Sequence, residues 1–460
     1  MKSRRSVAVV GAGISGLTVA FWLGKRGYDV TVLEKDIVPG GTMRTIREHG
    51  WLIETGPNSA LETTPLFDEM FECLGLLEER EYANPAANRR YILRNGELHP
   101  LPLTPGPFLR SRLWSAKGKL RLLKEPFVGR ATKEETIAEF VERRLGREFL
   151  DYAINPFVAG VYAGNPEQLS VAAAFPKLFA LEEKYGGLVK GMIKGARERR
   201  ERSEKAKDRA RMFSFRSGMQ TFPSAIARYL GDRVRLGCAV ESVRPARGGQ
   251  YTVFFSFAGK KESLTIDSLV LSTPADGAAE LLRSFSLSLA DRLEQVYYPP
   301  VAEVFLGFWI DQIPRELDGF GYLIPVKEQK NTLGTIWSSA IFSNRAPDSR
   351  AAFTTFVGGA RQPALLQQDD RELRETVLTD IRSIMGVRGE PVAEKIIRWD
   401  RAIPQYNLGY LGLCRDIDEF ESQHPGLLLC SNYRGGIAVG DCVMNGEKTA
   451  RNVERYLNGR

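Results

Sequence analysis

The stretch that decides the fold is SVAVVGAGISG, residues 6–16, in which an apolar run leads into a GxGxxG motif. The apolar residues predict a buried parallel strand, and the spacing of apolar residues from Leu17 to Leu23 predicts a helix directly after the glycines. A second strand is expected over residues 30–33, and it ends in the acid Glu34. This order of strand, glycine turn, helix, strand and acid predicts a Rossmann-type unit that binds the ADP half of a dinucleotide.

Each part of this unit has a physical role. Gly11 allows a tight turn, Gly13 lets the backbone approach a pyrophosphate, and Gly16 lets the helix lie close to the strand. The helix N-terminus presents free N–H groups and a positive dipole end to the phosphates. Glu34 is placed to accept hydrogen bonds from the ribose hydroxyls. A glycine turn without a ligand is the alternative, and the unit by itself does not distinguish NAD from FAD.

Two further glycine-containing segments follow the acid. They are KDIVPGGTMR, residues 35–44, and GWLIETGPNS, residues 50–59. A glycine pair alone is an ordinary turn signal. Together with the first unit, however, the GG-x-x-R stretch resembles the flavin-dependent amine oxidase superfamily, whose members bind FAD in an extended form. The resemblance implies that these loops run along the pyrophosphate and the flavin of a non-covalently bound FAD.

Two later segments are expected to complete the FAD site. Residues 234–243 and 251–257 predict two strands, and the resemblance brings Val240 to the adenine through its backbone. A plain β-hairpin is the alternative. Near the C-terminus, residues 426–430 predict a strand, and GGIAVGDC, residues 435–442, leads into a helix expected over residues 446–457. The N-terminus of such a helix suits the partly negative N1–C2 region of the flavin, although a glycine turn that only caps a packed helix is the alternative.

Three segments narrow the resemblance. They are NPFVAGVYAGNP (155–166), FSFRSGMQTFP (213–223) and WDRAIPQY (399–406). They resemble the oxygen-dependent protoporphyrinogen oxidase family, which includes enzymes that act on coproporphyrinogen III. The resemblance extends from residue 6 to the last expected helix.

The resemblance also implies which residues bind the cofactor and the substrate. Arg90 matches a position where the family sets an arginine against a substrate propionate, and a solvated surface arginine is the alternative. Gly160 matches a glycine whose carbonyl faces the macrocycle, and a glycine that packs a helix is the alternative. The residues expected to line FAD are Gly11, Ala12, Gly13, Ile14, Ser15, Gly16, Glu34, Lys35, Gly41, Gly56, Pro57, Asn58, Ser59, Val240, Trp399, Ile437, Ala438 and Val439.

Two positions depart from the family pattern. Thr42 stands where relatives usually carry a basic residue, so a side-chain contact to the cofactor is not expected there. The leucine and phenylalanine that would sandwich the macrocycle find no match between residues 300 and 390.

The predicted fold class is α/β, with a discontinuous Rossmann-type FAD-binding domain, a mixed-sheet substrate domain and a helical subdomain. The FAD-binding domain is expected to comprise residues 1–88, 215–285 and 415–460. The substrate domain comprises residues 89–108 and 286–414, and the helical subdomain residues 109–214.

The function implied by the resemblance is FAD-dependent, six-electron oxidation of a porphyrinogen in heme biosynthesis. The substrate is protoporphyrinogen IX or coproporphyrinogen III, the product is the matching porphyrin, and dioxygen accepts the electrons to give hydrogen peroxide. The flavin abstracts the hydride, so no catalytic side chain is assigned. A rival is another oxidase or desaturase of the superfamily, but its amine oxidases place a lysine near flavin N5. The strand expected to match that position, residues 301–309, contains no lysine. A non-catalytic FAD-containing tetrapyrrole-binding protein also stays open.

Composition and charge limit the partners. The chain of 460 residues is 43% hydrophobic and 26% charged, as in ordinary globular proteins, and five cysteines without a CxxC pair indicate a reducing, cytoplasmic compartment. Three histidines give no zinc-type ligand cluster. The net charge of +8 suits an acidic partner or an anionic membrane surface, whereas no motif favours nucleic acid.

Two basic segments are candidates for contact with a membrane surface. Residues 197–211, RERRERSEKAKDRAR, predict a solvated charged helix, and the alternative is a contact with lipid headgroups. Residues 105–122 mix aromatic and aliphatic residues with arginine and lysine and favour the same peripheral contact, on the inner face of the membrane. No apolar run reaches the length of a membrane span.

Overall fold

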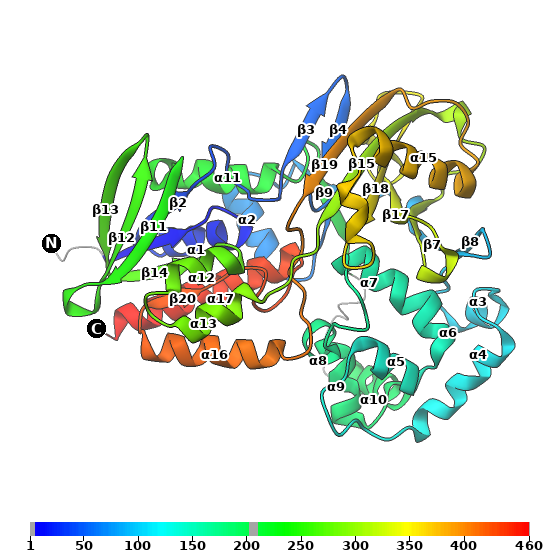
Figure 1. Ribbon diagram of the computed structural model, residues 1–460, viewed down its shortest axis with the longest axis horizontal. Helices are drawn as coiled ribbons and strands as arrows, with labels where there is room; N and C mark the ends of the chain where they lie inside the picture. Colours follow the sequence, from blue (N-terminus) through cyan, green and yellow to red (C-terminus); the bar gives the residue numbers. More distant parts are fainter. Residues whose placement is uncertain (1–4, 202–209, 460) are drawn as a thin grey trace.

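The computed structural model describes residues 5–201 and 210–459, whose elements form two halves (Figure 1). One half contains a parallel sheet with helices α1 (Ile14–Lys25) and α17 (Val439–Asn458), so that both ends of the described chain lie in it. The other half contains a seven-stranded sheet and the helices from α3 to α10. The α/β fold class predicted from the sequence is confirmed.

A five-stranded parallel sheet forms the centre of the first half. All four pairings are parallel, and β1 lies in the middle with Val7, Ala8 and Val9 fully buried. Burial on both faces explains why this strand is a continuous apolar run. In sheet order the strands are β10 (Val234–Leu236), β2 (Asp29–Glu34), β1 (Ser6–Val10), β14 (Ser268–Leu271) and β20 (Leu427–Leu429).

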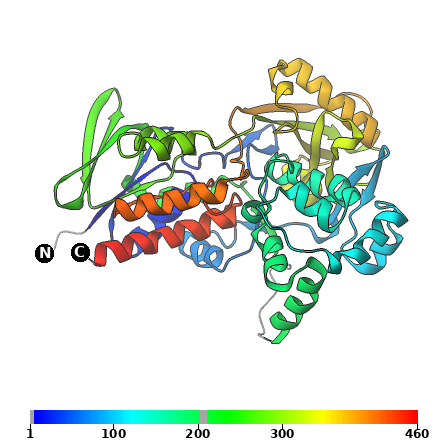
Figure 2. The same ribbon diagram turned by 60° about the horizontal axis from the view of Figure 1, so that its bottom comes forward.

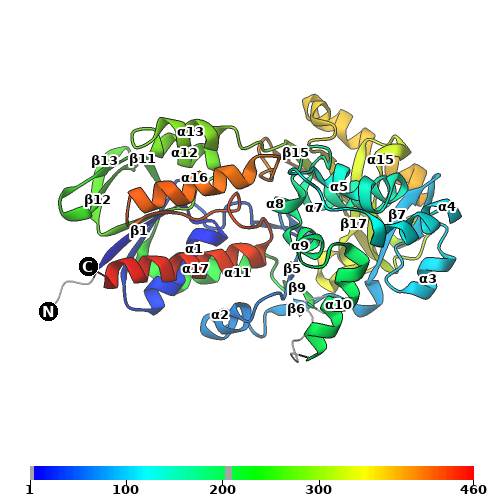
Figure 3. The same cartoon turned by 90° about the horizontal axis from the view of Figure 1, so that it is seen from below.

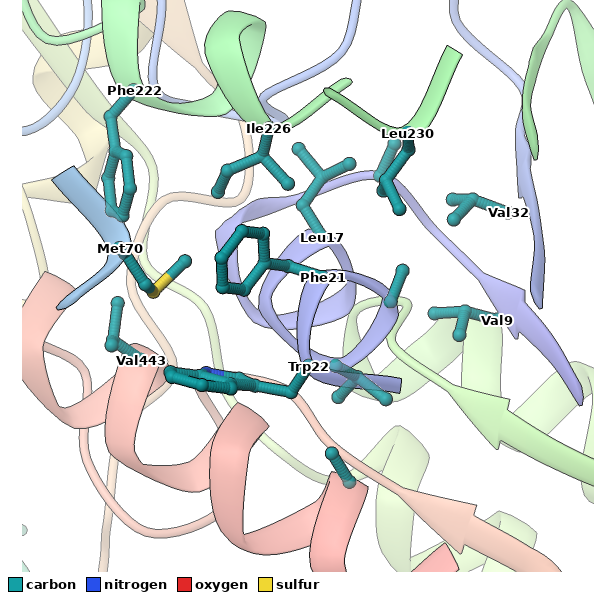
Figure 4. Close-up of a cluster of buried hydrophobic side chains, with 14 of the residues drawn as sticks. Val9, Leu17, Phe21, Trp22, Val32, Met70, Phe222, Ile226, Leu230 and Val443 are labelled. Carbon is teal, nitrogen blue, oxygen red and sulfur yellow. The ribbon is translucent and has the colours of Figure 1, made fainter. Parts of the chain in front are cut away.

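Helices α1 and α17 lie side by side against this sheet (Figures 1 and 3). Their close approach depends on Gly446, because a Cβ there would lie 2.7 Å from Cβ of Thr18. Around α1, Phe21 and Trp22 pack with side chains of α17, α2 (Leu66–Leu74) and α11 (Thr221–Leu230) in the core drawn in Figure 4. Each such buried side chain contributes about 1.5–3 kcal/mol to folding.

Two boundaries predicted from the sequence are wrong. Residues 234–243 do not form one strand, because Gly237 takes a φ of 70° and turns the chain between β10 and β11 (Cys238–Pro245). β10 joins the parallel sheet, whereas β11 pairs antiparallel with β12. The last helix begins at Val439, earlier than the predicted residue 446.

Further elements complete the first half. The second, antiparallel sheet and three helices share one core on the other side of the parallel sheet. They are β11, β12 (Tyr251–Phe257), β13 (Lys260–Ile266), α12 (Ala275–Leu282), α13 (Leu287–Glu294) and α16 (Tyr410–Gln423).

Two small antiparallel sheets lie between the halves. The hairpin of β3 (Thr45–Glu48) and β4 (Trp51–Glu54) reaches toward the seven-stranded sheet, where Trp51 packs edge-on against Phe305. The other small sheet has the order β5-β9-β6, with β5 (Ala60–Leu61), β9 (Met212–Phe215) and β6 (Arg80–Tyr82).

The second half is built on a seven-stranded mixed sheet. Its order is β19-β15-β18-β17-β16-β7-β8, and α15 (Asp370–Met385) covers one face through a core of buried aliphatic and aromatic residues. The pairing of β16 with β7 is parallel and the other pairings are antiparallel. The strands are β7 (Arg89–Arg94), β8 (Glu97–Pro100), β15 (Val301–Trp309), β16 (Gly319–Leu323), β17 (Thr332–Trp337), β18 (Arg350–Gly358) and β19 (Ala393–Trp399); the short α14 (Ser338–Ile341) follows β17.

Helices between residues 105 and 201 gather at the far end of this half (Figure 2). A buried ion-pair cluster joins them, since the guanidinium of Arg144 is fully buried and pairs with Glu125 and Glu182. The predicted charged segment 197–211 lies partly in α10 and partly outside the described residues. The helices are α3 (Pro105–Arg110), α4 (Ala116–Arg121), α5 (Ile137–Arg144), α6 (Arg147–Phe149), α7 (Asn155–Tyr162), α8 (Val171–Ala174), α9 (Pro176–Tyr185) and α10 (Leu188–Glu201).

Candidate functional site

The first glycine turn lies where β1 meets α1, and its three glycines have different surroundings. A Cβ on Gly11 would lie 2.7 Å from the carbonyl oxygen of Ser272, and a Cβ on Gly16 would lie 2.1 Å from that of Gly11. Both positions therefore need glycine for packing. Gly13, in contrast, would meet nothing within 4 Å. Its open side is where a phosphate group can approach the backbone.

The glycine pair Gly40-Gly41 lies against the first glycine turn. Gly40 donates its N–H to the carbonyl of Ala12 at 2.8 Å, and Gly41 lies with its would-be Cβ 3.5 Å from Cα of Gly13. Arg44 closes the loop by donating its Nε–H to the Gly41 carbonyl at 2.9 Å and by pairing with Asp36. Thr42 lies in the same loop, and its carbonyl would meet a Cβ of Gly56 at 2.2 Å. The structure thus brings Gly41 and Gly56 to the first turn.

Glu34 ends β2 beside the first turn. Its carboxylate accepts the Ala12 N–H at 2.6 Å on one oxygen and the Asp36 N–H at 2.9 Å on the other. These bonds hold the acid in a fixed orientation, and each oxygen keeps a second lone pair for a ribose hydroxyl. Lys35 is exposed directly after it.

Residues 56–59 form the loop between β4 and β5. Asn58 donates from its side-chain amide to the Gly56 carbonyl at 3.2 Å, and Pro57 and Ser59 flank it. The indole N–H of Trp399 donates to the carbonyl of Thr55 at 2.6 Å. Trp399, at the end of β19, therefore lies next to the turn that the sequence assigned to the flavin.

Val240 lies on β11, beside the end of β2. It is partly buried and pairs with Phe255, and an extra residue in the ladder follows it as a β-bulge. A bulge leaves backbone groups of the strand unpaired. Gly237 donates its N–H to the Asp36 carbonyl at 3.0 Å, which ties this segment to the residues after Glu34.

Two tyrosines hold the C-terminal glycine turn. The hydroxyl of Tyr406 accepts the Gly436 N–H at 2.9 Å, and that of Tyr410 accepts the Gly435 N–H at 3.2 Å. The two rings stack with centroids 4.1 Å apart. Burial raises the pKa of both phenols, so both keep their protons.

The turn leads into α17 next to the N-terminal motif. A Cβ on Gly440 would lie 2.5 Å from Oγ1 of Thr63, and one on Gly446 would lie 3.0 Å from the Ser15 carbonyl. Ile437, Ala438 and Val439 form the entry to α17, with Ala438 exposed. Segments from both ends of the chain thus lie together at the edge of the parallel sheet that is formed by the carboxyl ends of its strands.

The residues at this edge fit a bound dinucleotide. Gly13 and Ala438 precede α1 and α17, and neither helix has a side-chain cap in the described part of the chain, so backbone N–H groups at these N-termini are available to a ligand. The hydroxyls of Ser272 and Thr273, after β14, are buried and find no hydrogen-bond partner among the described residues. Open space at Gly13, uncapped helices and unpartnered hydroxyls are what a phosphate-bearing group requires.

The two expected substrate residues both lie against β16. Arg90 is exposed on β7, opposite Gly321, with its guanidinium 5.7 Å from the ring centroid of Phe320. Gly160 lies on α7, where a Cβ would meet Leu323 of β16 at 2.5 Å. Gly160 therefore lies where α7 packs against β16, and a larger residue there would require the Leu323 side chain to shift.

Sequence reasoning missed Arg361, which follows β18. Its guanidinium donates to the Ile324 carbonyl at 2.8 Å and to the Asn155 side-chain oxygen at 2.9 Å. Burial lowers its pKa to about 10, and no carboxylate among the described residues forms an ion pair with it. Arg361 is half-buried, and only the fold brings it to Asn155, so the sequence carried no signal for it.

Two buried acids were also missed. Glu303 lies on β15, is 4% exposed, and has one carboxyl oxygen without a hydrogen-bond partner among the described residues. Glu54 ends β4 and lies 3.3 Å from the guanidinium of Arg345. Burial raises the pKa of Glu54 to about 7, and burial together with the charge of Glu54 raises that of Glu303 well above its ordinary value.

Within the described ranges no three His, Cys, Asp or Glu side chains are arranged to hold a metal ion. Nor does any helix of residues 5–201 or 210–459 combine the length and the hydropathy of a membrane span.

Comparison with known proteins gives a family and full-length relatives. Residues 14–454 match the model of the family described as flavin containing amine oxidoreductase. Protoporphyrinogen oxidase 2, chloroplastic/mitochondrial, of Arabidopsis thaliana is 34% identical over 485 residues, which cover 99% of this chain and 95% of the relative. Coproporphyrinogen III oxidase of Bacillus subtilis (strain 168) is 27% identical over 473 residues and is covered to 99%, as is this chain.

Solved structures share the fold. A protein from Exiguobacterium sp. 255-15, whose name assigns it provisionally as a protoporphyrinogen oxidase, superposes with a TM-score of 0.82 at 24% identity over 99% of both chains. Putrescine oxidase bound to putrescine has a TM-score of 0.71 at 19% identity, covering 98% of this chain and 99% of the other. At these identities the likeness concerns the fold.

Proposed function

Because this chain belongs to the flavin containing amine oxidoreductase family, and within it to the protoporphyrinogen and coproporphyrinogen oxidases, we propose that it oxidises a porphyrinogen to the corresponding porphyrin. FAD is its cofactor. The observation that carries the proposal is the meeting of both chain ends at one edge of the parallel sheet, beside Trp399 of the second sheet. In this arrangement a flavin would face the strands and helices that carry Arg90 and Gly160.

The chain's own residues hold and orient the cofactor. Residues 11–16 and Gly41 would receive the pyrophosphate, Glu34 and Lys35 the ribose side, and Val240 the adenine. Residues 56–59, Trp399 and the entry to α17, residues 437–439, would enclose the flavin. Bound FAD supplies the redox chemistry by taking up a hydride from a methylene bridge of the macrocycle.

The proposed substrate surface combines apolar walls with cations. Phe320 and Leu323 lie on β16 between Arg90 and Gly160. Arg361 adds a second cation close to α7 through its bond to Asn155. A porphyrinogen is a large apolar ring with carboxylate arms, and guanidinium groups bind carboxylates through paired N–H donors. We propose that Arg90 binds one propionate of the substrate and that the positive charge of Arg361 attracts a second propionate.

Steady-state oxidation of protoporphyrinogen IX and of coproporphyrinogen III, followed by porphyrin fluorescence, tests the function and the substrate preference. We expect Arg90→Ala to raise KM by about 10-fold or more, since a charge-assisted bond contributes about 1.5–3 kcal/mol. Arg89→Ala is the matched control, because Arg89 is its neighbour on β7 but pairs with Asp318. Equal KM values for wild type and Arg90→Ala would remove Arg90 from the substrate site.

The remaining proposals concern the acceptor and the domains. Dioxygen is the proposed electron acceptor, with hydrogen peroxide as the product, and three rounds of two-electron transfer complete the six-electron oxidation. The division into residues 1–88 with 215–285 and 415–460, residues 89–108 with 286–414, and residues 109–214 stays a proposal. A non-catalytic FAD-containing tetrapyrrole-binding protein is the alternative, and turnover of either porphyrinogen would exclude it.

A peripheral membrane contact is proposed for the helices around α4. Large apolar side chains are exposed here, with Leu103 at 79%, Leu123 at 70% and Phe127 at 88%. Leu109 and Leu120 are exposed as well, and arginines and lysines of residues 110–124 lie among them. Apolar side chains ringed by cations suit an anionic lipid surface.

Flotation with vesicles of anionic and of neutral phospholipid tests this contact. Wild type should float with anionic vesicles at low salt, and the pair Leu123→Ser and Phe127→Ser should reduce the floating fraction severalfold. Leu287→Ser, on an exposed leucine of the first half, is the control. Absence of wild type from the floating fraction at low salt would overturn the proposal.

A further inference from the structure

Glu303 is buried on the face of β15 that packs against α7 and the β3–β4 hairpin. Along β15, Ala302 and Val304 pack into the core under α15. The alternating residues Val301, Glu303 and Phe305 therefore point to the opposite face of the sheet. On that face Val301 packs with Ala159 of α7, the helix that carries Gly160, and with Ala163 directly after it. Phe305 packs against Trp51 of the β3–β4 hairpin. Glu303 lies between these two contacts and beside Trp399.

No opposite charge compensates this carboxyl. Among the described residues no arginine, lysine or histidine forms an ion pair with Glu303, and one of its oxygens has no hydrogen-bond partner. The nearby acid is Glu54, which accepts bonds from the Thr45 hydroxyl at 2.7 Å and the Met219 N–H at 3.0 Å. Arg345 forms an ion pair with Glu54, and the charge of Arg47 also favours the ionised form of Glu54.

The charge balance therefore allows one carboxylate here. Glu54 with Arg345 makes a neutral pair, whereas a second carboxylate at Glu303 would be buried without a counter-ion and next to a like charge. Burying an uncompensated charge costs several kcal/mol, so a carboxyl in this position keeps its proton instead.

We propose that Glu303 is a neutral carboxylic acid in the resting protein and that it donates its proton when dioxygen is reduced. This inference rests on the proposed function, which brings a flavin next to Trp399. In each round the porphyrinogen loses a hydride from a bridge carbon and a proton from a pyrrole nitrogen, and dioxygen gains two electrons and two protons to become hydrogen peroxide. Glu303 supplies one of these protons, and the proton released from the pyrrole nitrogen restores the acid, so the cycle balances.

The location of the acid fits a donor better than a base. A group that is protonated at rest cannot accept the pyrrole proton first, but it can protonate a reduced oxygen species that forms in a dry site. One carboxyl oxygen interacts with the Trp399 side chain, and the other has no hydrogen-bond partner among the described residues, so the acid lies beside Trp399 with one oxygen uncommitted. A general acid in such a position accelerates proton transfer by about 10²- to 10⁴-fold.

The protonation state is tested by infrared spectroscopy of the FAD-loaded protein. At about pH 8.5 Glu54 is largely ionised, because its pKa is about 7, whereas Glu303 should still show the C=O stretch of a carboxylic acid. We expect this band to shift in D₂O and to disappear in Glu303→Gln. It should remain in the control Glu48→Gln, whose carboxyl lies on the β3–β4 hairpin with Glu54 but is exposed and paired with Lys395. A spectrum in which wild type and Glu303→Gln do not differ would overturn the proposal.

The proton transfer is tested by reducing the flavin with dithionite and mixing the protein with dioxygen. This reaction needs no porphyrinogen, so its outcome is separate from that of the proposed function. We expect Glu303→Gln to slow reoxidation by about 10-fold or more, while Glu48→Gln reoxidises at the wild-type rate. Reoxidation of Glu303→Gln at the wild-type rate would overturn the donor role. If Glu303→Gln does not fold, the wild-type infrared band and the pH dependence of wild-type reoxidation still decide the question.

Discussion

Single glycines in the first turn differ in what they do, and this difference is testable. Gly13 borders open space, whereas a Cβ on Gly16 would meet the Gly11 carbonyl at 2.1 Å. We expect Gly13→Ala to unfold at the wild-type temperature but to bind FAD at least about 10-fold more weakly, because the methyl group occupies the phosphate side. Gly16→Ala should lower the unfolding temperature even without FAD.

Thermal unfolding of the FAD-free proteins and flavin titration check these expectations. Gly129→Ala is the control, since Gly129 borders open space far from the turn. If Gly13→Ala bound FAD as tightly as wild type, the first turn would not be the phosphate site.

The buried acids give the protein a defined dependence on pH. Glu54 and Glu303 both have pKa values above those of an unfolded chain, so the folded state binds more protons than the unfolded state above about pH 4.5. Their contribution to stability is greatest below that pH and is lost as the pH rises. For Glu54 the loss is complete above about pH 7 and amounts to about 3 kcal/mol.

Glu303→Gln should therefore be more stable than wild type at pH 8, and the difference should shrink toward pH 4.5. Urea unfolding of the FAD-free proteins across this range measures it. A variant that is less stable than wild type at pH 8 would mean that Glu303 is ionised and paired in the fold.

At the residue level, the sequence predicted a functional residue where that residue belongs to a local motif with a known chemical role. The glycines of residues 11–16 and Glu34 carry their role in their spacing, and they lie together in the structure. Glu303 and Arg361 carry no such signal, because an acid in a strand and an arginine after one are usually exposed. Their burial follows from packing between strands and helices that are distant in the sequence.

The element that holds the C-terminal turn is the segment from Tyr406 to Tyr410. Tyr406 donates its O–H to the Asn432 carbonyl at 2.5 Å and accepts the Gly436 N–H, so it bridges the turn. Tyr406→Phe should weaken FAD binding by about 5- to 10-fold, since loss of a buried hydrogen bond costs about 1–1.5 kcal/mol.

Tyr433→Phe is the matched control for this prediction. Tyr433 is fully buried next to the same turn, but its hydroxyl has no hydrogen-bond partner among the described residues. Isothermal titration with FAD should give wild-type affinity for Tyr433→Phe. Equal losses in both variants would indicate a general packing effect and not an effect on the turn.

At the level of elements, the sequence predicted which segments form strands and helices better than it predicted where each begins and ends. The strands of the first unit follow from their apolar runs, and β15 has the predicted bounds. The break at Gly237 was missed because the apolar pattern continues across it, and only the positive φ separates a parallel from an antiparallel partner. The start of α17 was missed because Gly440 and Gly446 obscure the helix, although both are needed for close packing.

For the whole molecule, local sequence patterns predicted the fold class but not which distant segments pack together. The α/β class follows from alternating strand and helix signals in the first unit. That β20 enters the parallel sheet beside β14, and that α17 packs against α1 from more than 400 residues away, cannot be deduced from local periodicity, and the family resemblance supplied it. The helical region is held by the buried pairs of Arg144, which arise from three separate segments.

The most direct test of the account is to mix the FAD-loaded protein with coproporphyrinogen III or protoporphyrinogen IX in the absence of oxygen and to follow the visible absorption of the flavin. The already aromatic porphyrin, which has no hydride to give, is the control. We expect at least one porphyrinogen to bleach the flavin within seconds, and air to restore the absorption as porphyrin appears. A flavin that stays oxidised for minutes with both porphyrinogens would contradict the account and leave a protein that binds tetrapyrroles without oxidising them.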